Sequence, residues 1–196
     1  MKKGSIATMV LFILGALFLL LANMLVTTSD SSIIYNHIHF DFGAILFLFI
    51  SIVLFIIFEV ILPKKPLLMM IPFFLILLPV TKNNIINYFI EFDYLFLDAN
   101  SFVVTTMPGV IAIVLLSVSI IFGLQKQKWA NITGIVSSSF FLFAHLSYLT
   151  PKLSEYPQNT PIIFISAILG IMMIFTGFIV YFAQNLYVNR SKAIKE

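Results

Sequence analysis

The stretch that decides the fold is the beginning of the chain, MKKGSIATMVLFILGALFLLLANMLV, residues 1–26. Two lysines precede an apolar run of about 21 residues, which is longer than the roughly 7 to 15 residues of a signal-peptide core. No A-x-A cleavage pattern follows the run. Because about 20 apolar residues form a helix that crosses a bilayer, this stretch predicts a retained first membrane helix.

The composition extends this interpretation to the whole chain. Of the 196 residues, 61% are apolar and 10% are charged, whereas a soluble domain carries roughly a quarter charged residues. The pattern predicts an all-α polytopic membrane protein with one transmembrane domain over residues 1–196. Its six expected spans are 6–27, 42–62, 67–82, 102–124, 130–149 and 161–187. The third is short and contains Pro72 and Pro79, so it is expected to be thinned or kinked.

The basic residues indicate how these spans are oriented. Nine of the eleven Lys and Arg residues fall in the termini and connections on one side, and only Lys82 and Lys152 fall on the other. Since cytoplasmic connections are enriched in Lys and Arg, both termini are expected in the cytoplasm, and the expected location is the cytoplasmic (inner) membrane of a bacterial cell. The basic residues form no continuous patch, so nucleic acid is not an expected partner.

One outer connection has the pattern of a helix that lies on the membrane. Between the third and fourth predicted spans, polar side chains recur at steps of three and four residues, at Asn84, Asn87, Glu91, Tyr94 and Asp98. The remaining faces of this helix would be apolar, which is typical of a helix in the outer interface.

The three histidines belong to a candidate outer polar site. In NHIHFD, residues 36–41, the side chains of His37, His39 and Asp41 would share one face of an extended segment. Imidazole and carboxylate groups are ligands for divalent metals, and other outer groups could complete the shell, namely Glu91, Asp98 and His145. A pH-sensitive surface and an ordinary solvated loop are alternative interpretations. No cofactor besides such a metal is predicted.

Glu59 is the one carboxylate inside a predicted span. An acid within a membrane helix suggests a relay for protons or cations. Glu59 also lies five and six residues before Lys64 and Lys65, so its side chain could instead extend toward these lysines at the cytoplasmic boundary.

Small residues mark the helix faces that can approach closely within a membrane. The fifth predicted span has Gly134 and Ser138 four residues apart, and the sixth has Ser166 and Gly170, with Gly177 two turns later. This spacing predicts that the fifth and sixth spans pack against each other.

The sequence assigns no catalytic residue. With no cysteine in the chain, thiolate metal sites and cysteine nucleophiles are excluded. Phosphate-binding, dinucleotide-binding and H-E-x-x-H motifs are missing. Seven residues of helix place Ser138 about 10 Å along the axis from His145, too far for a nucleophile and its base.

These features lead to an expected membrane transport component or accessory subunit with an outward-facing polar site. Its expected partners are the lipid bilayer and another membrane protein subunit. An alternative is a non-transporting interaction, immunity or sensor subunit, which the near absence of buried charge favours. A third is a metal-dependent enzyme at the outer interface that uses the three histidines with Asp98 or Glu91.

Overall fold

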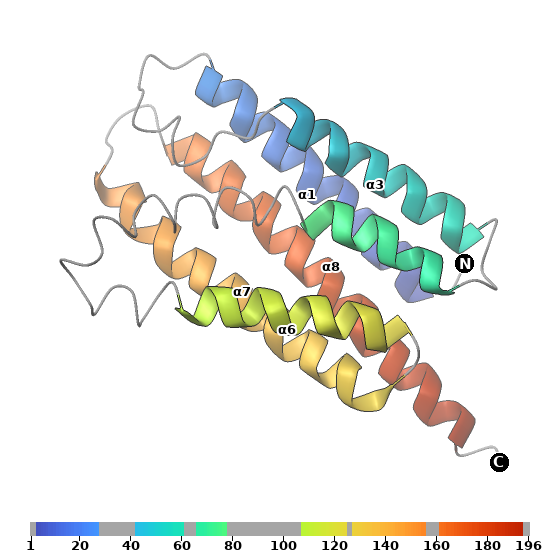
Figure 1. The fold of residues 1–196 in the computed structure, drawn as a ribbon. Coiled ribbons are helices and arrows are strands. Elements are labelled where there is room, and N and C mark those ends of the chain that lie inside the picture. The colour runs from blue at the N-terminus through green and yellow to red at the C-terminus, as the bar shows by residue number, and fades with distance from the viewer. Residues whose placement is uncertain are drawn as a thin grey trace.

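The computed structural model describes residues 3–27, 42–60, 66–77, 107–124, 127–155 and 161–193, and within these ranges the chain is entirely helical (Figure 1). The long helices are α1 (Lys3–Thr27), α3 (Phe42–Val60), α6 (Met107–Leu124), α7 (Lys128–Glu155) and α8 (Pro161–Ala193). A 3-10 turn, η1 (Pro66–Met69), leads directly into a short α-helix over 70–77. The all-α prediction is therefore confirmed for the described residues.

The helices form one bundle in which α8 packs against both α1 and α7. On one side of this trio α3 packs against α1, and on the other side α6 packs against α7. The segment of η1 and helix 70–77 contacts α3 and α6 and lies between them in Figure 1. The helices thus follow one another in the order α3, α1, α8, α7 and α6, and the short segment contacts both the first and the last of them.

The third predicted span, 67–82, is described only in part. Its described part, 66–77, comprises 12 residues and would extend about 18 Å as an α-helix, and residues 78–82 lie outside the described residues. Pro72 lies in the first turn of helix 70–77, where backbone N–H groups lack intrahelical partners and a proline is tolerated. Pro79 lies outside the described residues.

The exposed faces of the helices are apolar. On α1 the large exposed side chains recur at steps of three and four, so they form one continuous stripe: Ile6, Val10, Leu14, Leu17, Leu21 and Met24. Among the side chains that the structure describes, the buried polar ones are all uncharged: Ser5, Thr8, Ser51, Ser119, Asn131, Ser137, Ser138 and Ser166. A water-soluble protein has its polar groups at the surface. The observed distribution is the one expected of a helical bundle surrounded by lipid.

Two helices are long and apolar enough to cross a membrane by length and composition, over Ser5–Leu25 in α1 and Ile162–Tyr187 in α8. The described apolar parts of α3 and α6 are shorter, at Leu46–Glu59 and Ile111–Leu124. Membrane association is thus supported by two of the six expected spans.

The closest helix pair is α1 with α8. Thr8 Oγ1 donates to Gly177 O at 3.4 Å, and a Cβ atom added to Gly15 would lie 2.9 Å from Gly170 O. As the residue number rises on α1 it falls on α8, so the helices are antiparallel. Thr8, Gly15 and Ala22 are seven residues apart, all buried, and a seven-residue repeat of contacts is typical of helices that wrap around each other with a left-handed twist.

Candidate functional site

Glu59 is the acid whose environment the structure describes. It lies in the last turn of α3, and its Oε1 accepts a hydrogen bond of 2.6 Å from Ser5 Oγ at the beginning of α1. Ser5 is buried and Glu59 is half-buried. The bond joins two residues 54 positions apart in the sequence and holds the carboxylate against the bundle.

Two polar residues of α8 lie beside this pair. The hydroxyl of Tyr181, itself buried, is hydrogen bonded to the side chain of Asn185, and Tyr181 is close enough to Glu59 to sense its charge. Residues 181 and 185 share a helical face because they are four apart. We call Ser5, Glu59, Tyr181 and Asn185 the Glu59 cluster; it combines one carboxylate with two hydroxyl groups and an amide.

A layer of aromatic rings borders the Glu59 cluster. Phe73 of helix 70–77 contacts rings from three other helices, with centroid distances of 6.0 Å to Phe12, 5.7 Å to Phe55, 5.3 Å to Phe178 and 4.6 Å to Tyr181. All five rings are buried. They fill the space where α1, α3, helix 70–77 and α8 meet, and the ring of Tyr181 belongs both to this layer and to the Glu59 cluster.

Three buried polar atoms have no hydrogen-bond partner in the described part of the chain: Asn131 Oδ1, Ser138 Oγ and Gln184 Oε1. Asn131 Nδ2 does have one, since it donates to Gln127 O at 2.8 Å. A buried polar atom without a partner costs about 1–3 kcal/mol. A water molecule or a ligand with suitable groups would find a partner at each of these atoms.

The predicted packing residues are buried but do not all face the same neighbour. A Cβ on Gly134 of α7 would lie 2.7 Å from ring atoms of Phe182 on α8, whereas Cβ atoms on Gly170 and Gly177 would meet Leu19 and Phe12 of α1. Ser138 and Ser166 are also buried. α7 and α8 do pack together. However, Gly170 and Gly177, the α8 glycines on which this prediction rested, lie against α1 and not against α7.

Most of the candidate outer site lies outside the described residues. This applies to His37, His39, Asp41, Glu91 and Asp98, and to the predicted interfacial helix. His145 lies on α7, but its side chain is not among those described. Within the described residues no group of three metal-ligating side chains occurs. The metal site is therefore still a hypothesis.

Sequence reasoning identified Glu59 but not its neighbours. Ser5 lies at the start of the first apolar run, and hydropathy gives no reason to connect it with a residue at the end of the second. Tyr181 and Asn185 do carry a signal, because two polar groups four residues apart near the end of a long apolar helix define a polar face.

Comparison of the chain with family models, with curated proteins and with solved structures finds no match. The function must therefore be argued from the fold and from these side chains.

Proposed function

We propose that this chain is a six-span integral membrane protein of the bacterial cytoplasmic membrane, with both termini inside, that serves as an accessory subunit of a membrane assembly. The carrying observation is the reversal of the usual polarity, with apolar side chains outside and serines, a threonine and an asparagine inside. Lipid is the solvent in which this arrangement is stable.

The described interior fits an accessory subunit better than a protein that transports polar cargo by itself. Transporters of polar cargo place polar or broken-helix sites near the middle of the membrane. Here the meeting point of four helices is filled by five aromatic rings, and Glu59 lies at the end of the bundle, bonded to Ser5. This favours contacts made at the ends and faces of the bundle with lipid or with another membrane subunit.

The membrane topology can be tested without removing native thiols, because the chain has no cysteine. Single cysteines would be placed at Gln127 and Tyr187, which are exposed near one end of the bundle, and at Asn36 and Asn100 in the expected outer connections. In intact cells an impermeant maleimide should label positions 36 and 100 only, and permeabilisation should add 127 and 187. Labelling of all four positions in intact cells, or recovery of the protein in the soluble fraction, would refute the topology.

The accessory role can be tested with purified protein in liposomes. Alone, it should give no flux of protons, Na⁺ or K⁺ above empty liposomes, measured with pH-sensitive and cation-sensitive dyes. In native membranes, a photo-crosslinking residue at an exposed position of one helix face should then yield a discrete cross-linked species, while a position on another face should not. Suitable positions are Phe143 on α7 and Val53 on α3, which are 69% and 55% exposed.

A different result would favour transport. Flux by the wild-type protein that disappears in Glu59→Gln would overturn the accessory role and make the Glu59 cluster part of a cation or proton path. Uniform cross-linking to lipid from every face would also contradict a stable partner subunit.

A further inference from the structure

The connection between α6 and α7 carries an exposed patch of mixed character. Phe122, at the end of α6, and Trp129, at the start of α7, are 36% and 48% exposed, and their rings pack with centroids 5.4 Å apart. Trp129 Nε1 donates to Gln127 Oε1, and Lys128 is exposed beside them. We call Phe122, Gln127, Lys128 and Trp129 the Trp129 patch.

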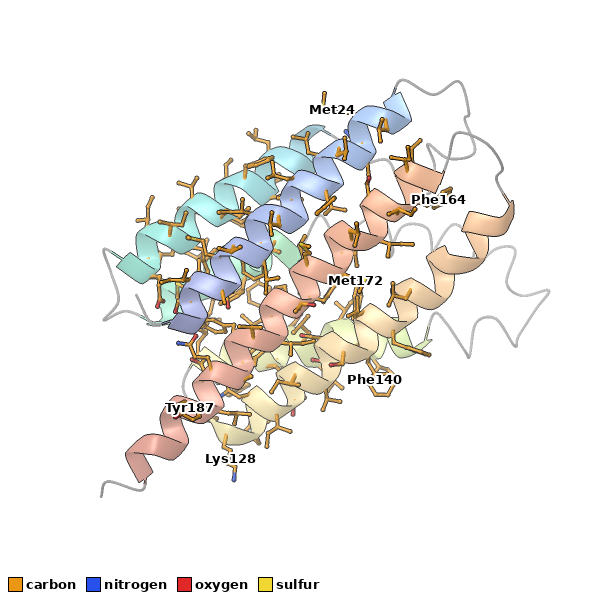
Figure 2. All side chains as sticks on the ribbon, turned by 180° about the vertical axis from the view of Figure 1, so that it is seen from behind. Met24, Lys128, Phe140, Phe164, Met172 and Tyr187 are labelled. Carbon is orange, nitrogen blue, oxygen red and sulfur yellow. The ribbon has the colours of Figure 1, made fainter. Side chains whose placement is uncertain are left out.

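The side chains of the Trp129 patch suit the boundary between hydrocarbon and headgroups. A tryptophan places its ring in the apolar region and its N–H toward polar groups, and exposed Trp and Tyr are enriched at this depth. Figure 2 shows Lys128 at the same end of the bundle as Tyr187, far from Met24 and Phe164. Tyr187 is 75% exposed, so two amphipathic aromatic side chains, from α7 and α8, mark this end.

The charge at this end is positive. No Asp or Glu occurs between positions 99 and 154, and Glu196 is the one acid after Tyr187. The sequence around the patch and after Tyr187 contains five basic residues: Lys126, Lys128, Arg190, Lys192 and Lys195. Glu59, whose carboxylate belongs to α3, accepts a hydrogen bond from Ser5, and neither residue belongs to α6 or α7. The acid of α7, Glu155, lies at the opposite end of that helix, so a phosphate group that approaches the Trp129 patch would meet basic side chains without a carboxylate from the adjoining ends of α6 and α7.

From the exposed lysine, the amphipathic rings and the local excess of basic residues, we infer that the Trp129 patch binds the headgroup of an anionic phospholipid. The lysine would pair with the phosphate, while the rings of Phe122 and Trp129 would lie against the upper acyl chains. This inference rests on the proposed location of the protein in a membrane, and it adds a specific lipid class as a partner of one end of the bundle.

The chain provides its own reporter, because Trp129 is its only tryptophan. The full-length protein would be reconstituted in liposomes that contain equal mole fractions of either brominated phosphatidylglycerol or brominated phosphatidylcholine. Quenching of Trp129 fluorescence should be stronger with the anionic lipid. Lys128→Gln should lower this preference about five-fold, which corresponds to about 1 kcal/mol for one basic residue at an anionic surface. High salt should lower it as well.

Lys152→Gln serves as the matched control, since it removes the same charge from the other end of α7 and should leave the preference unchanged. Equal quenching by the two lipids in the wild-type protein would overturn the inference but not the membrane location. Quenching by neither lipid would also overturn the inference, because Trp129 would then lie outside the bilayer; the membrane location itself is tested by the recovery of the protein in the liposome fraction. A preference that is retained in Lys128→Gln and in Lys126→Gln would also overturn the assignment to this patch.

Discussion

Replacement of Gly15 by alanine should separate α1 from α8. A Cβ atom at position 15 would lie 2.9 Å from Gly170 O, 3.2 Å from Ile174 N and 2.7 Å from Ile174 Cγ1. Contacts below 3.0 Å are essentially never observed for real Cβ atoms. Because two of these neighbours are backbone atoms of a helix, they cannot rotate away, and the clash is relieved only if the helices move apart.

The size of the effect follows from two opposing terms. Alanine favours a helix over glycine by about 1 kcal/mol, and an extra carbon in a well-packed interior costs about 1–3 kcal/mol. A backbone neighbour places the cost near the upper limit, so Gly15→Ala should lower the free energy of unfolding by about 2 kcal/mol. In Gly123→Ala the new atom would meet Phe182 Cε1 at 3.0 Å and Asn131 Oδ1 at 3.3 Å, both on side chains that can shift. That variant gains the same helix preference and should remain near wild-type stability.

Titration with SDS of the proteins in mixed micelles, followed by Trp129 fluorescence and circular dichroism, would compare their unfolding free energies. Both variants replace glycine by alanine, but the new methyl group meets backbone atoms in Gly15→Ala and side chains in Gly123→Ala. The difference between their unfolding free energies therefore reports how far the neighbouring atoms can move. Wild-type stability of Gly15→Ala, or equal destabilisation of both variants, would refute the close approach of α1 and α8.

Three further stability predictions use the same titration. The hydrogen bond between Ser5 and Glu59 should give a coupling of about 1 kcal/mol or more in a double-mutant cycle of Ser5→Ala and Glu59→Gln, and no coupling would mean that the two side chains act independently. Phe73→Ala removes a buried ring that contacts four others and should lower the free energy of unfolding by about 3–5 kcal/mol. Phe143→Ala, at a position 69% exposed, should leave the free energy of unfolding nearly unchanged, and an equal loss in both variants would contradict the burial of Phe73. Ser138→Ala removes a buried hydroxyl without a partner and should stabilise the protein by about 1 kcal/mol; a loss of stability would show that Ser138 binds something in the native protein.

The helices themselves were predictable because hydrophobic runs are local signals. α3 begins at Phe42, as expected, and α8 begins at Pro161 and continues beyond the expected end to Ala193. The third span, predicted over 67–82, is expected to be thinned or kinked because it is short and contains Pro72 and Pro79, and its described part is a 3-10 turn followed by a short helix. The number of segments that cross the membrane depends on where the lipid begins and ends along the helices. Hydropathy suggests this position, whereas the packing of the helices does not define it.

The partners of the packing glycines were less predictable. A small residue indicates a face on which a neighbour can approach, but it does not identify that neighbour. Gly170 and Gly177 lie against α1, whereas Gly134 lies against α8. The seven-residue spacing of Thr8, Gly15 and Ala22 on α1 matches the spacing of Gly170 and Gly177, and comparison of these two repeats would have indicated the pair.

The environment of Glu59 could not be predicted from local patterns. Its closeness to Lys64 and Lys65 in the sequence suggested a side chain directed toward the cytoplasmic boundary, but those lysines lie outside the described residues. The hydrogen bond from Ser5 crosses 54 positions, and it depends on α1 and α3 having packed together. The same limit applies to any metal shell assembled from His37, His39 and His145, because its completion would depend on tertiary contacts.

The distribution of polar groups bears on where function can reside. Three interior serines, Ser51, Ser119 and Ser137, donate to a backbone carbonyl three or four residues earlier in their own helix, so they offer little to a polar cargo. The aromatic layer around Phe73 adds one polar group, the hydroxyl of Tyr181, which belongs to the Glu59 cluster. The described groups that differ from this pattern are Glu59 with Asn185 and Lys128 with Trp129. They belong to the ends of α3 and α8 and to the start of α7, which lie at one end of the bundle (Figure 1). If that end faces the cytoplasm, as the basic residues predict, recognition of lipid or of a partner subunit at that surface requires no polar path through the aromatic layer.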